Sequence, residues 1–364
     1  MTTATRRRTR WTGRRLRGPL RTPRATPLGI PLSILLVAAL LGGCGSAVPA
    51  SAAASLDPSS PAGSPAGSPA APSATAASTP SPDSAATDAT AAASPTPEAS
   101  GSPAATPFRC TEARGTIKDY SYTSKAARTK VRYRVYFPPC YESSGKRFPY
   151  VVLMHGSDKD QTEWTRLMKA DRAIEKGIAE GTLPPMILVM PGGGDLANTR
   201  IFTAGRSYES VVMNEIIPAV DKRFCTWGNR AGREIGGISR GGFWAFLMAF
   251  RHPEKFAAVG GHSPFFHPDN APPTHNPLDL AKSVVFKENQ QPRIWVDRGR
   301  QDYAEPGITP FVATLKARKI PGTYKLYPTG RHEVAYWASH VATYLAFYGK
   351  TWPRSYDALP DCGS

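Results

Sequence analysis

Apolar and polar positions change their spacing several times along the chain, and from about residue 108 these changes follow a regular order. Two stretches, 116–122 and 131–137, have the composition of strands, and polar turn residues separate them, so they predict an antiparallel hairpin. Short continuous apolar runs then alternate with stretches of helical spacing. The runs predict strands at 150–154, 186–190, 234–238, 256–260, 293–296 and 323–326, and the stretches predict helices at 166–180, 208–224, 242–251 and 340–348.

This order predicts the fold class. Strands that alternate with helices indicate an α/β fold, in which helices cover both faces of a mostly parallel sheet. Continuous apolar strands, as opposed to alternating ones, are typical of such a doubly covered sheet. Reactive groups in this architecture gather on loops at the carboxyl ends of the strands, so a functional site is expected there.

The first 44 residues have a different pattern. They hold nine Arg and no acidic residue, and 27–41 is an apolar stretch of 15 residues, shorter than the roughly 20 residues of a membrane-spanning helix. A basic segment, an apolar segment and then small residues form the layout of a secretory signal peptide. The stretch ends in Leu41-Gly42-Gly43-Cys44, which resembles a bacterial lipobox and predicts lipidation of Cys44. A plain signal peptide and a short uncleaved anchor are the alternatives.

Residues 45–107 consist almost entirely of Ala, Ser, Pro, Thr and Gly. Such a segment has too few large apolar side chains to offset the entropy of ordering, so it predicts a disordered tether. As a random coil it would span about 45 Å. The expected organisation is a leader over 1–44, a tether over 45–107 and one domain over 108–364. The leader predicts a domain anchored outside the cytoplasmic membrane by lipid, or a secreted one.

The formal net charge of +17 raises the question of nucleic-acid binding. The leader accounts for nine of the positive charges, which leaves 36 Lys and Arg against 28 Asp and Glu, or +8, in the rest of the chain. No run of basic residues remains in the domain, so no nucleic-acid partner is predicted. The mildly basic surface is compatible with anionic envelope polymers or acidic substrates, and equally with an ordinary solvated surface.

The cysteines agree with export. Apart from Cys44 there are four, Cys110, Cys140, Cys225 and Cys362, and an even number in an oxidising compartment indicates two disulfides with three possible pairings. Cys110 and Cys140 lie at equal distances from the predicted hairpin turn, so the hairpin favours pairing them, and Cys225–Cys362 follows by elimination. Four free buried thiols are the alternative.

A nucleophile motif stands between a predicted strand and a predicted helix. The sequence Gly237-Ile238-Ser239-Arg240-Gly241 matches Gly-x-Ser-x-Gly, which alone is a common pentapeptide. Its position between strand and helix is that of a nucleophile elbow, where a sharp turn exposes the serine hydroxyl above the sheet. Gly237 and Gly241 leave room for that turn, so Ser239 is the predicted nucleophile.

A serine nucleophile needs a base and an acid that orients it, and in this fold they follow the serine in the order acid, then histidine. Of the seven histidines, His332 stands in the late loop after the last predicted strand, where the base is expected. The acid has two candidates, Asp297 at the end of a strand and Asp302 in the loop beyond. The loop position reaches His332 more easily, so Asp302 is the predicted acid. Asp297 is then a structural carboxylate that pairs with nearby amides or arginines.

The charge that develops on an attacked carbonyl oxygen needs two backbone N–H donors. One is the amide of Arg240, directly after the nucleophile. The other should come from the loop after the 150–154 strand, which reads Met154-His155-Gly156-Ser157. Gly156 or Ser157 would supply it, and the sequence leaves both open.

With these residues in place, the domain resembles the esterase family that contains esterase D, feruloyl esterases, siderophore esterases and mycobacterial mycolyltransferases. The segments that carry the resemblance are LMHGSDKDQTEW, VMPGGG, YESVVMNEIIPAVDKRF, GGISRGGFWA, WVDRGRQD and GRHEVAYW, over about 150–348. The resemblance implies an α/β-hydrolase fold, a triad of Ser239, Asp302 and His332, and an oxyanion region at Gly156 and Arg240. Family members often have Asp-Gly after the fourth strand, where this chain has Gly192-Gly193-Gly194-Asp195.

The leading hypothesis is hydrolysis of a small-molecule or envelope ester through an acyl-enzyme. Transfer of the acyl group to an envelope sugar or lipid alcohol, and a non-catalytic surface binding lipoprotein, are the alternatives. Trp164, Gly193, Phe265 and Trp337 are candidate substrate contacts, although the aromatic residues among them equally suit core or lid packing. A metal site formed by His262, His267 and His275 is disfavoured because their spacing matches no known ligand helix, so no metal or cofactor is predicted.

Overall fold

The computed structural model describes residues 106–363. The predicted signal peptide, Cys44 and all but the last two residues of the predicted tether lie outside the described residues. Eight strands form one sheet in the order β1-β2-β4-β3-β5-β6-β7-β8. Their bounds are β1 Thr116–Ser124, β2 Thr129–Phe137, β3 Tyr150–Met154, β4 Ile187–Pro191, β5 Arg233–Ile238, β6 Ala258–His262, β7 Arg293–Gly299 and β8 Thr323–Tyr327.

The sheet is mostly parallel, as the alternating pattern predicted. The hairpin of β1 and β2 is antiparallel and joins the rest of the sheet through an antiparallel β2–β4 pair. All pairings from β4 through β8 are parallel. The carboxyl ends of the six parallel strands therefore lie at one edge of the sheet, where loop residues can form a common site.

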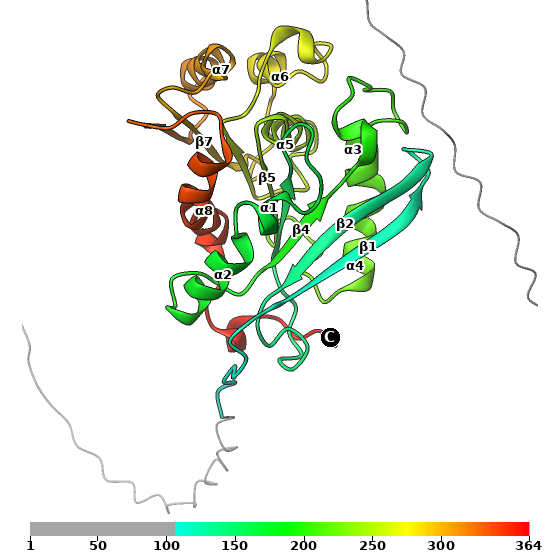
Figure 1. The fold of residues 1–364 in the computed structure, drawn as a ribbon, viewed down its shortest axis with the longest axis vertical. Coiled ribbons are helices and arrows are strands. Elements are labelled where there is room, and N and C mark those ends of the chain that lie inside the picture. Colours follow the sequence, from blue (N-terminus) through cyan, green and yellow to red (C-terminus); the bar gives the residue numbers. More distant parts are fainter. Residues whose placement is uncertain (1–105, 364) are drawn as a thin grey trace, which may run out of the picture. The chain divides into compact units, whose positions relative to one another are not determined.

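Helices cover both faces of the sheet (Figure 1). Their bounds are α1 Glu163–Arg166, α2 Ala170–Ala179, α3 Tyr208–Val211, α4 Ile217–Arg223, α5 Arg240–Arg251, α6 Pro277–Ser283, α7 Glu305–Ala317 and α8 Val334–Tyr348. A π-helical turn, Val212–Ile216, joins α3 to α4, and short 3-10 turns lie at Gly194–Ala197, Pro268–Asn270, Gly349–Thr351 and Tyr356–Ala358. Within the described part of the chain, no helix combines the length and the apolar character that crossing a membrane requires.

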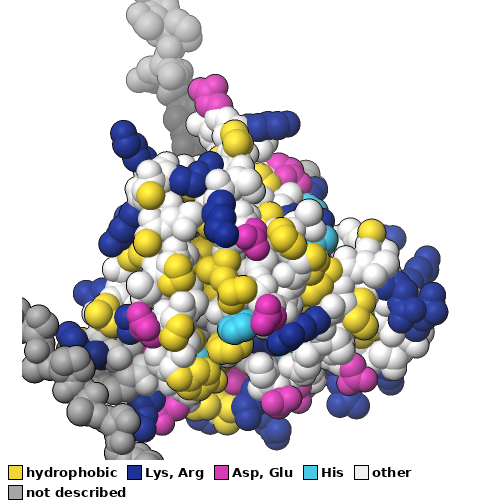
Figure 2. Space-filling view, turned by 90° about the horizontal axis from the view of Figure 1, so that it is seen from above, with side chains coloured by type: hydrophobic (Ala, Val, Ile, Leu, Met, Phe, Trp, Pro, Cys, Tyr) yellow, Lys and Arg dark blue, Asp and Glu magenta, His cyan; other side chains and the backbone are white. Residues whose placement is uncertain are grey.

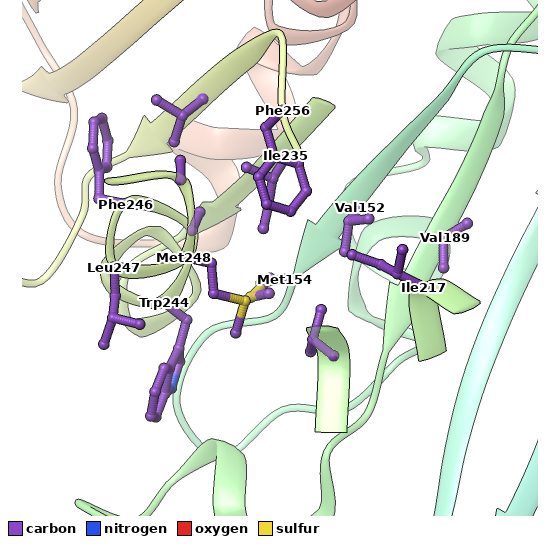
Figure 3. Packing of buried hydrophobic residues seen from close by; sticks show 14 of the residues in the cluster. Val152, Met154, Val189, Ile217, Ile235, Trp244, Phe246, Leu247, Met248 and Phe256 are labelled. Atoms are coloured by element: carbon purple, nitrogen blue, oxygen red, sulfur yellow. The ribbon is translucent and has the colours of Figure 1, made fainter. Parts of the chain in front are cut away.

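Two hydrophobic cores follow from this layering. Successive residues of a strand point to opposite faces, and on β3 Val152 and Met154 pack with α3 to α7, whereas Val151 and Leu153 pack with α1, α2 and α8. Figure 3 shows the first core, where Met154 of β3 meets Met248 of α5. Every residue of β3, β4 and β5 is buried, which explains the continuous apolar sequences of β3 and β4.

The structure differs from the expected elements in several places. The helix predicted over 166–180 is two helices, α1 and α2, which residues 167–169 separate. The strand predicted over 256–260 begins two residues later, and the strand predicted over 293–296 continues to Gly299. Helix α7 was not expected, because Pro306, Gly307 and Pro310 break a helical pattern in sequence. Pro306 stands at the start of α7, where its missing N–H costs no helical hydrogen bond.

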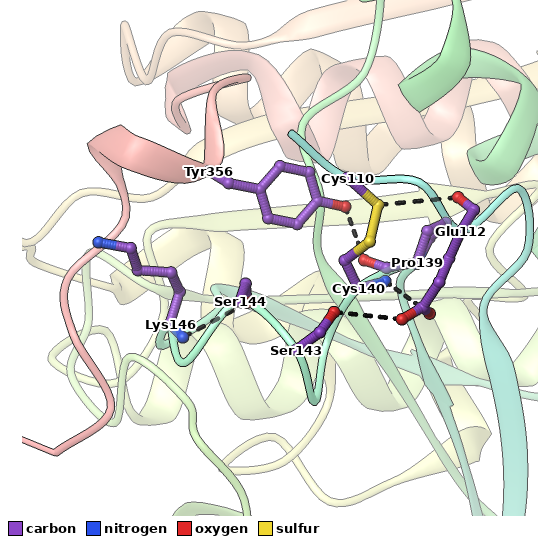
Figure 4. Close-up of a disulfide and its surroundings, with 8 residues drawn as sticks. All are labelled: Cys110, Glu112, Pro139, Cys140, Ser143, Ser144, Lys146 and Tyr356. Atoms are coloured by element: carbon purple, nitrogen blue, oxygen red, sulfur yellow. Dashed lines mark hydrogen bonds between the residues drawn. A yellow bond between two sulfur atoms is a disulfide. The ribbon is translucent and has the colours of Figure 1, made fainter. Parts of the chain in front are cut away.

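Two disulfides staple the domain, with the pairing that the hairpin favoured. Cys110 is bonded to Cys140, and Cys225 to Cys362. Figure 4 shows how the first disulfide is supported: Glu112 accepts the Cys140 amide at 2.8 Å, and Tyr356 donates to the Pro139 carbonyl at 2.7 Å. The second disulfide ties the C-terminal segment to the loop after α4.

Candidate active site

Ser239 occupies a strained turn between β5 and α5. Its φ of 52° and ψ of −120° lie outside the regions that a non-glycine residue ordinarily adopts. The two flanking glycines make the turn possible, because a Cβ on Gly237 would stand 2.4 Å from the backbone of Gly241, and a Cβ on Gly241 would stand 2.4 Å from the Met154 carbonyl oxygen. The local sequence thus forms the elbow that the motif predicted.

The structure brings His332 and Asp302 to this serine. The Ser239 Oγ lies 2.7 Å from His332 Nε2, and His332 Nδ1 lies 2.8 Å from Asp302 Oδ1. A carboxylate only accepts, so His332 donates from Nδ1 and its Nε2 is free to accept the serine hydroxyl. Residues 93 and 30 positions apart in the sequence thereby form one hydrogen-bonded chain.

The surroundings of Asp302 favour its charged form. Burial raises the pKa of this carboxyl, but the hydrogen bonds from His332 and the Ala304 amide, together with the nearby Ser263 hydroxyl, outweigh burial and hold the pKa below its usual range. The Ala304 amide donates at 2.9 Å. An ionised Asp302 can keep the His332 ring in the orientation and tautomer that a general base needs.

Asp297, the other candidate acid, lies within β7, and its side chain points into the core that packs against α8. Its Oδ1 accepts from Trp295 Nε1 at 2.7 Å and from His262 Nδ1 at 2.8 Å, and its Oδ2 accepts from two tyrosine hydroxyls. The expectation of amide or arginine partners was wrong, because indole, imidazole and phenol groups surround it. The side chains of Asp297 and His262 are both 0% exposed, so this second Asp-His pair has no access to a substrate.

The structure shows which of the candidate oxyanion donors, the amides of Gly156, Ser157 and Arg240, are free of other hydrogen bonds. The Gly156 amide donates to Glu163 Oε2 at 2.7 Å, so it is already used. Among the described residues, the amides of Ser157 and Arg240 have no hydrogen-bond partner in the protein. The Gly156 amide is therefore not available to an oxyanion, contrary to the first of the two expectations. Ser157 and Arg240 remain as the pair of free amides beside Ser239.

The side chain of Arg240 has a separate role. Its guanidinium donates to the Ala197 carbonyl at 2.9 Å and to the Thr199 carbonyl. Trp244, one turn further along α5, donates to the same Ala197 oxygen at 2.9 Å. These bonds attach the loop after β4 to helix α5. The guanidinium of Arg240 is therefore engaged in structure, and only its backbone amide faces the candidate site.

A pocket of about 460 Å³ opens above Ser239. Phe265, Tyr303 and Trp337 line it together with Ser239 and His332. The remaining lining residues are Gly156, Ser157, Asp158, Lys159, Glu163, Glu333 and Val334. The lining therefore combines aromatic side chains with polar and charged ones. Figure 2 shows hydrophobic side chains gathered with histidine at the centre of one face of the domain, with charged residues around them.

Two of the expected substrate contacts lie elsewhere. Trp164 is 1% exposed, and its indole donates to the Met154 carbonyl in the core. Gly193 adopts a φ of 72°, and a Cβ there would meet the Tyr208 ring at 2.1 Å, so this glycine is required by packing. Neither lines the pocket. Phe265 and Trp337 do.

Tyr303 and Glu163 are among the pocket residues that the sequence did not single out. Tyr303, directly after Asp302, is 66% exposed and places its ring 4.2 Å from that of His332. Glu163, directly before Trp164, is a buried carboxylate in the pocket wall. Its sequence neighbours are almost all polar, so no local signal marks Glu163 as a buried carboxylate.

The three histidines of the metal hypothesis lie apart. His262 contacts Asp297, His267 accepts the Asp269 amide, and His275 lies near Glu209. Within residues 106–363, no three His, Cys, Asp or Glu side chains are grouped so that they could hold a metal ion.

The sheet, its helix layers and the serine elbow define an α/β-hydrolase fold. The family model described as "Putative esterase" matches residues 124–348, more than half of the chain, and the chain belongs to this family. It is 32% identical over 154 residues to an endo-1,4-beta-xylanase/feruloyl esterase of Xylanibacter ruminicola, an alignment that covers 40% of this chain and 21% of that protein. This chain therefore spans about a fifth of that relative.

Solved structures share the fold. A ferulic acid esterase superposes with a TM-score of 0.58 and 22% identity, over 65% of this chain and 98% of that one. A fluorophosphonate-binding serine hydrolase of Staphylococcus aureus, solved with substrate bound, superposes with a TM-score of 0.56 and 20% identity, again over 65% and 98%.

Proposed function

We propose that this protein is a serine-dependent carboxylic ester hydrolase. The observation that carries the proposal is the continuous chain from Ser239 through His332 to Asp302, with both contacts shorter than 3 Å. Membership of an esterase family and the free amides of Ser157 and Arg240 support it.

The geometry suits a two-step reaction. The Ser239 oxygen attacks the ester carbonyl while His332 Nε2 takes the hydroxyl proton, and the carbonyl electron pair moves to oxygen, where the Ser157 and Arg240 amides can stabilise the charge. The tetrahedral intermediate collapses and expels the alcohol, which takes the proton from His332. Water then attacks the acyl-enzyme while His332 takes its proton. The second tetrahedral intermediate collapses to release the acid, and His332 returns the proton to the Ser239 oxygen.

The aromatic part of the pocket lining suggests what kind of acyl group would fit. Phe265, Tyr303 and Trp337 offer flat apolar surfaces for an aromatic or apolar acyl group. The relative with feruloyl esterase in its name gives a first substrate to try, an ester of a phenolic acid. Water is the acceptor in the proposal, and an alcohol acceptor at the same acyl-enzyme would give acyl transfer.

We place this activity outside the cytoplasmic membrane, with the domain on a tether that a lipid on Cys44 anchors. The two disulfides support an oxidising compartment, and the leader sequence supports export. Replacing Cys44→Ser should release the protein from the membrane fraction and abolish its labelling with a palmitate analogue. Continued labelling would contradict the anchor but not the esterase activity.

The decisive experiment is Ser239→Ala. Hydrolysis of 4-nitrophenyl acetate and methyl ferulate should fall by about 10⁴-fold or more, and fluorophosphonate labelling should disappear, while the circular dichroism spectrum stays unchanged. Ser283→Ala, at an exposed helix end, is the control and should keep full activity. Full turnover by Ser239→Ala would refute the proposal.

A further inference from the structure

Glu163 is an unusual group to find beside a nucleophile. It is 3% exposed, it begins α1, and it lines the same pocket as Ser239. Burial raises its pKa above the usual range, although the Gly156 amide and the charges of His155 and Lys159 act in the opposite direction. A Cβ built on Gly156 would lie 3.7 Å from both Glu163 Oε2 and Ser239 Cβ, so one glycine separates the carboxylate from the nucleophile.

His155 contacts the same loop from another side. Its Nδ1 lies 2.7 Å from the Gly156 carbonyl oxygen, and its Nε2 lies 2.7 Å from the Gly192 carbonyl oxygen. A carbonyl oxygen only accepts, so both ring nitrogens must donate, and only the imidazolium form does this. The acidic groups that act on this ring are Glu163 and Asp160, and a buried charge requires such partners.

These contacts fix the orientation of one peptide plane. The Gly156 carbonyl and the Ser157 N–H belong to the same planar trans peptide, in which C=O and N–H point in opposite directions. When His155 holds the Gly156 oxygen, the Ser157 N–H is directed to the other side. Glu163 holds the preceding amide, that of Gly156, so both ends of Gly156 are restrained.

We propose that His155 and Glu163 are buried positioning residues that hold Gly156 through its carbonyl and its amide and so aim the Ser157 amide at the developing oxyanion. Neither group takes part in bond making. This inference rests on the proposed ester hydrolysis at Ser239. It gives a role to a buried carboxylate whose desolvation costs free energy.

The first test compares Glu163→Leu with Glu175→Leu. Glu175 is a matched control, because its side chain is only 10% exposed and accepts a backbone amide, that of Gly115, at 3.0 Å, but the contact lies away from the loop. Since loss of one oxyanion donor lowers kcat by roughly 10² to 10³, Glu163→Leu should lower kcat by about tenfold or more and leave KM within about twofold. Glu175→Leu should lose stability but not kcat.

A second variant covers the case in which Glu163→Leu does not fold. Glu163→Gln keeps the shape and one acceptor but removes the charge. Side-chain ¹⁵N NMR, with His155 assigned through His155→Gln, should show both His155 nitrogens protonated at neutral pH in the unmodified protein and a smaller protonated fraction in Glu163→Gln. A neutral His155 in the unmodified protein, or a kcat of Glu163→Leu within about threefold of normal, would overturn the inference.

The outcomes separate this inference from the proposed function. If Ser239→Ala abolishes turnover while Glu163→Leu has normal kcat, the esterase assignment stands and the positioning role fails. If Ser239→Ala retains full turnover, the esterase assignment fails whatever Glu163→Leu does.

Discussion

Ser157 and Arg240 contribute to the candidate site through backbone N–H groups. For that reason the identity of the Ser157 side chain should matter little, while the presence of its N–H should matter greatly. The Ser157 residue lines the pocket, and its amide has no other partner among the described residues.

Ser157→Pro removes this N–H and should lower kcat for 4-nitrophenyl acetate by about 10² to 10³, the usual effect of losing one oxyanion donor. Ser157→Ala keeps the N–H and should retain kcat within about threefold. Steady-state kinetics of both variants, with melting temperatures to confirm folding, are the measurement. Equal kcat values for folded Pro and Ala variants would exclude the Ser157 amide as a donor.

The lowered pKa of Asp302 predicts a dependence of stability on pH. A carboxyl whose folded pKa lies below its unfolded value of about 4 stabilises the fold above that value and loses this contribution as pH falls through the folded pKa. Urea unfolding of the unmodified protein and Asp302→Asn should therefore show a constant difference above about pH 5 that shrinks below about pH 4. A difference that grows towards acid pH would contradict the cited shift.

At the scale of elements, α8 is held to the sheet by a buried polar cluster. Tyr336 and Tyr344 of α8 donate to Asp297 Oδ2 at 2.6 and 3.0 Å. Tyr348, at the end of α8, lies 2.9 Å from His262 Nε2 of β6. His332 stands two residues before α8 begins, so the cluster holds in place the helix that directly follows the His332 loop.

Asp297→Ala would leave the Trp295, His262, Tyr336 and Tyr344 donors without an acceptor in the core. Buried donors and charges that lose their partner cost about 3 kcal/mol or more, and the free energy of unfolding in urea should fall by at least that amount. The control is Asp279→Ala, which removes a surface ion pair with Lys282 and should cost less than about 1 kcal/mol. Similar losses for the two variants would mean that the cluster contributes little.

At the scale of the whole domain, the two disulfides close loops of very different length. Their partners are separated by 30 residues for Cys110–Cys140 and by 137 residues for Cys225–Cys362. In the chain-entropy model these loops correspond to about 3.5 and about 5 kcal/mol of stabilisation. The longer one fastens the C-terminus, whose Tyr356 and Leu359 belong to the core.

Cys225→Ser with Cys362→Ser should therefore lower the melting temperature more than Cys110→Ser with Cys140→Ser. Differential scanning calorimetry of the two double variants under non-reducing conditions measures this order. The reverse order would show that local contacts around Cys110, and not loop closure, dominate.

The sequence by itself determined the α/β class, the positions of most strands, the elbow at Ser239 and the choice of His332 and Asp302. These features are local or ordered along the chain: apolar runs set the strands, two glycines permit the turn, and chain order selects the acid and the base. Helix α7 was not predicted because Pro306 and Pro310 both look like helix breakers in sequence. In the structure Pro306 stands in the first turn, and the packing of the helix on the core keeps Pro310 inside it.

Only the tertiary structure decided which amides are free, which aromatic side chains reach the pocket and where Asp297 points. Gly156 loses its expected role because Glu163, seven residues later, takes its N–H. Trp164 and Phe265 are both aromatic in sequence, yet one packs under the sheet and the other lines the pocket. Such outcomes depend on contacts between elements that are far apart in the sequence, and hydrophobic spacing does not encode these contacts. A strand or the Ser239 turn, in contrast, is specified by the residues next to it in the sequence.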